Sequence, residues 1–250
     1  MKIAVRGGHT ELCTGASALI NELTEDRKVT AAVVKYLREL GNEVLDVTPP
    51  VNYTSSSSAD LAYGVNKANS WGADLFVSIH FNKVYNSYNG ALGSEVCVYS
   101  THEIAQRVVN ALGALGFKNR GQKIRTGLYE LKHTKMKAMI VETCFVEATE
   151  DVDLYRKLGA DAIGKAIAEA IANKKVQTVT TSSNQSNSGL GYRVKITASV
   201  LNVRKGAGTN YSIATTVKNN EVYTIVEEKN GWGKLKSGAG WISLSYATKL

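Results

Sequence analysis

Residues 74–80, DLFVSIH, give the clearest strand signal in this chain, and the run ends on His80. Its apolar, β-branched and aromatic residues are typical of a buried strand. Two other strand-like runs end in a similar way, because KIAVRGGH ends on His9 and AMIVE ends on Glu142. In an open α/β sheet, parallel strands place their carboxyl ends along one edge, where ligands bind. The sequence therefore predicts that two imidazoles and a carboxylate converge at one edge of a sheet.

Helical patterns separate these strand-like runs. Apolar residues recur on one face of four segments, at about 23–40, 58–71, 102–115 and 150–173. Further strands are expected at 43–48 and 93–100, with a short one near 128–132. Because strands alternate with helices, we predict an α/β fold with a mostly parallel, open twisted sheet flanked by helices.

The composition of the chain changes after Asn173. Residues 174–190 are polar and rich in Ser, Thr and Asn, which predicts a flexible linker. Beyond the linker, short alternating runs are separated by turn signals such as KNG, which predicts a small all-β barrel over 191–250. We therefore expect two domains, 1–173 and 191–250.

The net charge of +8 is unevenly distributed. Residues 190–250 hold nine Lys and Arg against three Asp and Glu, a net charge of +6. Residues 1–189 hold 21 against 19, a net charge of +2. A basic C-terminal part indicates a polyanionic target, either nucleic acid or a cell wall with acidic polymers. The three cysteines lack CxxC spacing, so they indicate neither a disulfide framework nor a cysteine-rich zinc cluster.

The N-terminal residues MKIAVRGGHTELC contain no apolar run long enough for a signal peptide. No segment of the sequence is long and apolar enough to span a bilayer. We therefore expect synthesis in the cytoplasm and no membrane insertion. If the protein acts outside the cell, we expect another factor to release it.

His9 and His80 supply two of the three protein ligands that a catalytic zinc site usually has. Two glutamates, Glu22 and Glu25, flank the start of the helix that follows the first strand. Either carboxylate could turn back toward the sheet edge as the third ligand, and either could instead be a solvated acid favoured by the helix dipole. Glu142 closes its strand at the rim, so it is better placed as a general base than as a ligand.

Two further polar residues are expected to contact substrate. Asn82 follows the strand that ends on His80, and His133 precedes the strand of Glu142. His133 could instead hydrogen-bond to a metal ligand, or it could have only a helix-cap or surface role.

Four motifs occur in a fixed order along the chain: a strand ending in GGH, a Glu at a helix start, SIHFN and VETCF. Together they resemble the zinc-dependent N-acetylmuramoyl-L-alanine amidases of the amidase-3 type, which are peptidoglycan hydrolases, and similar endolysins of phages of clostridia. The resemblance covers about residues 1–173. It implies that His9, Glu22 and His80 bind zinc and that Glu142 acts in catalysis.

Two details of the first motifs bear on this resemblance. The family usually has a Pro-Gly-His-Gly-Gly type of turn, whereas this chain reads RGGHT, with Arg6 before two glycines. The NE pair that ends on Glu22 resembles the endolysin pattern better than Glu25 does, which favours Glu22 as the third ligand.

The C-terminal part resembles a bacterial SH3 (SH3b) domain in its LNVRKGAGTNY and NGWGKLKSGAGW motifs. Domains of that family commonly bind cell-wall peptidoglycan. The resemblance implies a wall-binding face, for which Arg204, Lys205 and Tyr211 are candidates. Trp232 and Trp241 are expected in the core of the barrel.

These features together favour a hydrolase in which zinc-activated water cleaves the amide between N-acetylmuramic acid and the L-alanine of the stem peptide. A phage endolysin that lyses a clostridia-like Gram-positive host is the expected setting, with a host autolysin as the alternative. A zinc peptidase acting on stem or cross-bridge peptides and a catalytically inactive wall-binding protein are the other hypotheses. Nucleic acid is not an expected partner, because the basic part lacks an RNA- or DNA-binding motif. The sequence leaves open the wall ligand and the oligomeric state.

Overall fold

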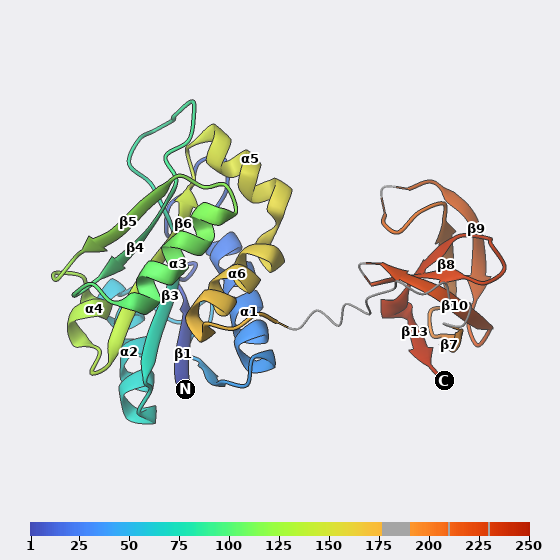
Figure 1. The fold of residues 1–250 in the computed structure, drawn as a ribbon, viewed down its shortest axis with the longest axis horizontal. Helices are drawn as coiled ribbons and strands as arrows, with labels where there is room; N and C mark the ends of the chain where they lie inside the picture. Colours follow the sequence, from blue (N-terminus) through green and yellow to red (C-terminus); the bar gives the residue numbers. More distant parts are fainter. Residues whose placement is uncertain (177–190, 210, 230) are drawn as a thin grey trace. The chain divides into compact units, whose positions relative to one another are not determined.

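The computed structural model describes residues 1–176, 191–209, 211–229 and 231–250 (Figure 1). The chain divides into two compact units, Met1–Thr178 and Val179–Leu250. Apart from its first three residues, the linker expected over 174–190 lies outside the described residues. None of the helices within the described ranges combines the length and the apolar composition that crossing a bilayer requires.

The first unit is a six-stranded sheet with helices on both faces (Figure 1). Its elements are β1 (Lys2–Gly7), α1 (Glu22–Glu39), β2 (Glu43–Asp46), α2 (Ser57–Trp71), β3 (Leu75–Asn82), β4 (Ser94–Val98), α3 (Glu103–Ala114), β5 (Asn119–Ile124), α4 (Tyr129–His133), β6 (Lys137–Phe145), α5 (Thr149–Leu158) and α6 (Ala160–Ala172). The strand order is β2-β1-β3-β6-β4-β5, and β4 against β6 is the antiparallel pair. The other neighbouring strands run parallel, so the predicted mostly parallel sheet is confirmed.

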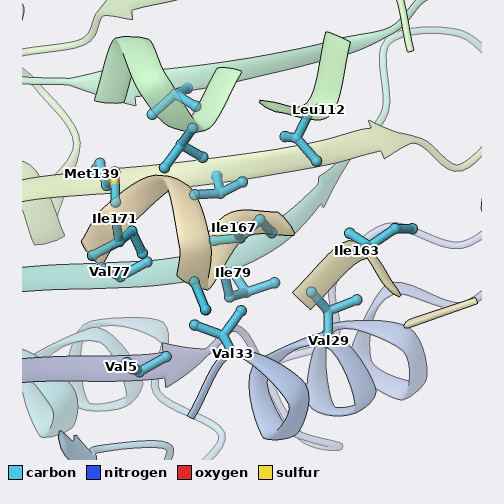
Figure 2. Close-up of a cluster of buried hydrophobic side chains, with 14 of the residues drawn as sticks. Val5, Val29, Val33, Val77, Ile79, Leu112, Met139, Ile163, Ile167 and Ile171 are labelled. Atoms are coloured by element: carbon cyan, nitrogen blue, oxygen red, sulfur yellow. The ribbon is translucent and has the colours of Figure 1, made fainter. Parts of the chain in front are cut away.

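Alternate residues of the central strands point to opposite faces of this sheet. In β3, Val77 and Ile79 belong to the large apolar cluster built with α1, α3 and α6, whereas Phe76 belongs to a smaller cluster with residues of α2 and α4. Figure 2 shows Val77 beside Ile171 and Ile79 beside Ile167, both of α6, with Val33 of α1 close to Ile79. We call the first side the core face and the second side the site face. By the same alternation, Arg6, Ser78, His80 and Glu142 belong to the site face.

The structure corrects three sequence-based expectations in the first unit. The segment near 128–132 is a short helix, α4, whose apolar residues pack on the site face instead of forming a strand. Strand β5 was missed because its sequence, NRGQKI, is polar and half-exposed and pairs only with β4 at the edge of the sheet. The helix expected over 150–173 is two helices, since Gly159 adopts a φ of +78° between α5 and α6.

The second unit is an antiparallel sheet, which confirms the expected small SH3-like domain. Its elements are β7 (Tyr192–Ile196), β8 (Val200–Arg204), β9 (Ile213–Lys218), β10 (Val222–Lys229), β11 (Trp232–Leu235), β12 (Trp241–Ser243), a short 3-10 helix (Leu244–Tyr246) and β13 (Ala247–Lys249). The strand order is β13-β7-β10-β11-β12-β8-β9. The expectation for the two tryptophans is wrong, because Trp232 and Trp241 are half-buried and lie outside the buried apolar cluster around Ile225.

Candidate metal centre

His9, Glu22 and His80 come together at the carboxyl edge of β1 and β3. Glu22 Oε1 lies 3.3 Å from His9 Nε2 and 3.1 Å from His80 Nδ1. One ligand atom from each residue falls within 4.8 Å of the other two, so the three could hold one metal ion. The convergence expected for these three residues is therefore present in the structure.

The backbone after β1 presents His9 to this edge. The Gly8 amide still donates to the Ile79 carbonyl at 3.1 Å, which keeps the chain beside β3. His9 then adopts a φ of +57°, a left-handed conformation that turns the chain away from the sheet. The His80 ring packs against Gly8, where a Cβ atom would lie only 2.4 Å from His80 Cε1. Glycine is therefore required at this position for the second imidazole to fit.

Glu22 is fixed at the first residue of α1 by backbone donors. Its Oε1 accepts a hydrogen bond from the Phe81 amide at 2.9 Å, and its Oε2 accepts one from the Ala16 amide at 2.5 Å. Glu25 lies elsewhere, because its carboxylate accepts from the Tyr155 hydroxyl at 2.7 Å and pairs with Lys28 at 2.8 Å. Of the two glutamates, Glu22 is the one that the structure places with the imidazoles.

Hydrogen bonds on the outer nitrogens leave the inner nitrogens free to bind a cation. His9 Nδ1 lies 3.2 Å from the Cys13 carbonyl, which can only accept, so in a neutral ring Nδ1 carries the proton and the lone pair is on Nε2. His80 Nε2 lies 3.0 Å from Ser78 Oγ, while its Nδ1 faces Glu22. Two imidazole nitrogens and a carboxylate oxygen thus surround one point, and a cation there satisfies all three.

The ionisation of these groups reflects the same demand for positive charge. Burial raises the pKa of Glu22, but hydrogen bonds and charge from His80 and His9 outweigh it, and the net pKa is lowered. Burial lowers the pKa of His80, but the Glu130 and Glu22 carboxylates outweigh it and raise the net value well above the ordinary one. The donor set of two nitrogens and one carboxylate oxygen is the one that zinc accepts in catalytic sites. The residues present therefore fit a zinc ion.

Glu142 lies beside the cluster on the neighbouring strand, directly opposite His80 in the register of β3 and β6. Burial raises the pKa of Glu142, and the nearby carboxylates of Glu22, Glu95 and Glu130 raise it further. The charge of His80 lowers this pKa, and the net value is about 7. Its Oε2 is buried without a hydrogen-bond partner among the described residues. Such a carboxylate is suited to exchanging a proton near neutral pH.

The two expected substrate contacts have different surroundings. Asn82 ends β3, and its side-chain amide donates to Glu95 at 3.3 Å, so it lies next to the partner of Glu142 in the sheet. His133 ends α4, where its ring stacks on Tyr129 and its carbonyl accepts from Asn69 near the end of α2. The structure does not place His133 with the metal cluster, and its role in substrate binding stays a prediction.

A buried ionic group beneath His80 was not predicted from the sequence. Arg6 is fully buried, and its guanidinium donates to Glu130 Oε1 at 2.6 Å and to Asp60 Oδ2 at 2.8 Å. The available signal was Arg6 itself, a charged residue inside an apolar strand that must find a partner when buried. A cavity of about 360 Å³ opens above this group, and its lining includes His9, His80 and Asp60.

The candidate wall-binding residues of the second unit form one corner of that unit. Arg204 Nη1 donates to the Tyr211 carbonyl at 2.8 Å, and the Lys205 amide donates to the Ser212 carbonyl at 3.0 Å. The Tyr211 side chain packs against Gly206 and is 46% exposed. The structure thus brings Arg204, Lys205 and Tyr211 together on the surface.

Comparison with known proteins places both units in families. Residues 3–173 match the family described as N-acetylmuramoyl-L-alanine amidase, and residues 199–248 match the bacterial SH3 domain. An uncharacterised protein of Clostridium perfringens is 48% identical over 71% of this chain and 53% of its own length. This chain therefore spans about half the length of that relative.

Characterised proteins and a solved structure agree with the match. The N-acetylmuramoyl-L-alanine amidase CwlM of Bacillus licheniformis is 31% identical over 79% of this chain and 75% of its own length. The catalytic domain of CD27L, an endolysin targeting Clostridia Difficile, has a TM-score of 0.64 and 31% identity, covering 71% of this chain and 99% of that one. By the family match, the relatives and the shared fold, the chain belongs to the N-acetylmuramoyl-L-alanine amidase family and carries a bacterial SH3 domain after its α/β unit.

Proposed function

We propose that the first unit hydrolyses the amide between N-acetylmuramic acid and the L-alanine of the peptidoglycan stem peptide, with zinc held by His9, Glu22 and His80. One observation carries this proposal. Two imidazole nitrogens and the Glu22 carboxylate face one point at the carboxyl edge of the sheet, and Glu142 lies on the next strand. Family membership gives the class of substrate.

The residues around the ion have separate roles in this reaction. Bound between its three ligands, zinc would polarise the scissile carbonyl and make a coordinated water more acidic. Glu142 would accept the proton of the attacking water and then deliver it to the leaving amine, for which its raised pKa is suitable. The cavity beside His9 and His80 would receive the substrate, and Asn82 would contact it near Glu142.

We further propose that the second unit holds the enzyme on the cell wall through Arg204, Lys205 and Tyr211. An exposed aromatic ring with two cationic side chains suits a polymer that offers sugar rings and acidic groups. Attachment through this unit raises the local substrate concentration for the first unit. Nucleic acid is not part of this proposal.

The biological setting that we propose is a phage endolysin, made in the host cytoplasm and acting on the wall after release. The similarity to the CD27L catalytic domain, which belongs to an endolysin, supports this setting. The bacterial SH3 domain that follows the amidase unit also supports it.

The experiment that tests the activity is digestion of purified clostridial peptidoglycan, followed by mass spectrometry of the soluble products. An amidase releases intact stem peptides with a free L-alanine amino terminus, and chelation by EDTA followed by added zinc abolishes and restores this release. Truncated peptides that remain joined to muramic acid would instead establish a peptidase. Binding to the wall with no product would establish an inactive wall-binding protein.

A further inference from the structure

The ionic group on the site face is costly for stability alone. Arg6 and Glu130 are buried in full or nearly so, and Asp60 beside them is 3% exposed. Buried ion pairs can often be replaced by apolar residues of similar size without loss of stability. Arg6 also needs space inside α2, because a Cβ atom on Gly64 would lie 2.7 Å from Arg6 Cδ. A glycine inside a helix is itself destabilising relative to alanine. These costs suggest a second purpose for the group.

The hydrogen bonds around Glu130 have defined directions. The Arg6 guanidinium can only donate, and it donates to Glu130 Oε1 at 2.6 Å. Ser78 Oγ also donates to that oxygen, at 3.2 Å. A hydroxyl carries one proton, so a Ser78 that donates to Glu130 must accept from its other neighbour. That neighbour is His80 Nε2, 3.0 Å away.

The direction of this chain sets the tautomer of His80. A neutral ring that donates from Nε2 to Ser78 keeps its lone pair on Nδ1. Nδ1 is the nitrogen that faces Glu22 Oε1, at 3.1 Å, and it is therefore the nitrogen offered to the metal. Glu130 Oε2 lies 3.7 Å from Nε2, which adds attraction to the same N–H without a direct hydrogen bond.

We propose that Glu130, held in place by Arg6, is a positioning residue that acts through Ser78 to orient His80 and to present its Nδ1 to the metal. The proposal rests on the zinc site proposed above. Carboxylates that fix a metal-binding histidine from behind commonly set its tautomer and strengthen the metal site. Arg6 has a role in the same arrangement, because its guanidinium pairs with the buried Glu130 carboxylate. Arg6 belongs to the RGGHT turn, which differs from the turn that the family usually has.

A purely structural role for the group is the rival explanation. In that case the ionic group only joins β1, α2 and α4, and its loss would lower stability without a specific effect on the metal. The two explanations differ in how Ser78 behaves. Ser78 contacts both Glu130 and His80. The ion pairs of Arg6 with Asp60 and Glu130 do not include Ser78, so we expect them to persist in Ser78→Ala.

The test is the zinc affinity of the full chain, measured without substrate by competition with a chromophoric chelator. We expect Ser78→Ala and Glu130→Gln each to weaken zinc binding, Ser78→Ala by about 10- to 100-fold. The double variant should lose little more than Ser78→Ala alone, because both residues act through one chain of hydrogen bonds. Ser94→Ala is the matched control, since Ser94 is a buried strand serine that donates to the Thr143 carbonyl, and it should keep wild-type affinity.

The nitrogen signals of His80 give a second readout that a structural role would not move. In the zinc-loaded wild type, nitrogen-15 spectra should show zinc on Nδ1 and the proton on Nε2. Zinc on Nε2, or zinc affinity within twofold of wild type in both single variants, would overturn the proposal. A loss of affinity equal to that of Ser94→Ala would do the same. A wild-type chain that binds no zinc would refute the proposed function itself, and this inference with it.

Discussion

The two faces of the first sheet are built from alternate residues of the same strands, yet they differ sharply in chemistry. On the core face, residues such as Val77 and Ile79 are fully buried among apolar side chains of α1, α3 and α6 (Figure 2). On the site face, Ser78 and His80 meet Glu130 and Glu22. Successive residues of one strand therefore alternate between packing in the apolar core and contributing to the candidate metal centre.

This difference follows from the period of a strand. Because side chains alternate, a change at one position alters one face and leaves the other in place. The site face also includes the carboxyl edge of the sheet, where residues of α2 line a cavity together with His9 and His80. We therefore expect substitutions on the two faces to have separable effects.

His80→Ala and Ile79→Ala are adjacent substitutions on opposite faces. We expect His80→Ala to abolish zinc binding and hydrolysis, because it removes one of three ligands, while the apolar core on the opposite face stays intact. Ile79→Ala should instead destabilise the first unit by about 2–5 kcal/mol, because it opens a cavity in the core. Metal analysis and thermal unfolding of both variants check this. Loss of zinc from folded Ile79→Ala would show that the two faces are not separable.

Glu142→Gln should separate catalysis from metal binding on the site face itself. Removal of a general base costs about 10²- to 10⁴-fold in rate. Zinc content should stay at the wild-type level, because Glu142 lies outside the three-residue cluster. Rates of peptide release from purified walls provide the measurement. Glu103→Gln is the control, since Glu103 is an exposed helix residue paired with Arg107, and unchanged rates are expected there.

Gly8→Ala should disturb the site face without adding or removing a ligand. The new Cβ atom would lie 2.4 Å from His80 Cε1, so the ring must move. We expect a loss of zinc affinity of about tenfold, as for other changes that misplace a ligand. Gly127→Ala is the matched control, because a Cβ atom there meets nothing within 4 Å. Equal zinc affinity in the two variants would mean that His80 is not held by this contact.

Tyr211→Ala should give the smallest effect, because Tyr211 belongs to the second unit and not to the unit that holds the candidate metal centre. We expect a loss of about 1 kcal/mol in binding to purified walls, roughly a fivefold rise in Kd. Hydrolysis of a soluble muropeptide should be unchanged. Tyr246→Ala is the comparison, since Tyr246 is 54% exposed in the same unit but lies outside the corner of Arg204 and Tyr211. Co-sedimentation with cell walls measures both variants.

The convergence of His9, His80 and Glu142 was predictable from sequence because each residue follows an apolar strand run, although β3 continues to Asn82 and β6 to Phe145. Such runs mark buried parallel strands, and parallel strands share an edge. The choice between Glu22 and Glu25 needed the structure. Both glutamates lie in the first turn of α1. The Glu22 carboxylate is directed to the imidazoles by the Phe81 amide, which is distant in sequence, and by the Ala16 amide, which lies in a loop. Local sequence patterns reveal neither contact.

Local sequence patterns could not predict the partners of Arg6 in the ionic group beneath His80, for a related reason. Arg6 and Glu130 are 124 residues apart, and no periodicity connects them. Glu130 also lies in α4, a five-residue helix in a segment where a short strand was expected. Short elements and long-range charge pairs depend on tertiary contacts, which sequence propensities do not encode.

The zinc content of Glu22→Ala and of Glu25→Ala decides which carboxylate completes the metal centre. Both substitutions remove a carboxylate from the first turn of the same helix, so they are matched in chemistry and position. With His9, Glu22 and His80 as the ligands, metal analysis should find one zinc per chain in the wild type and in Glu25→Ala, and none in Glu22→Ala. Retained zinc in Glu22→Ala, or its loss from folded Glu25→Ala, would contradict the account.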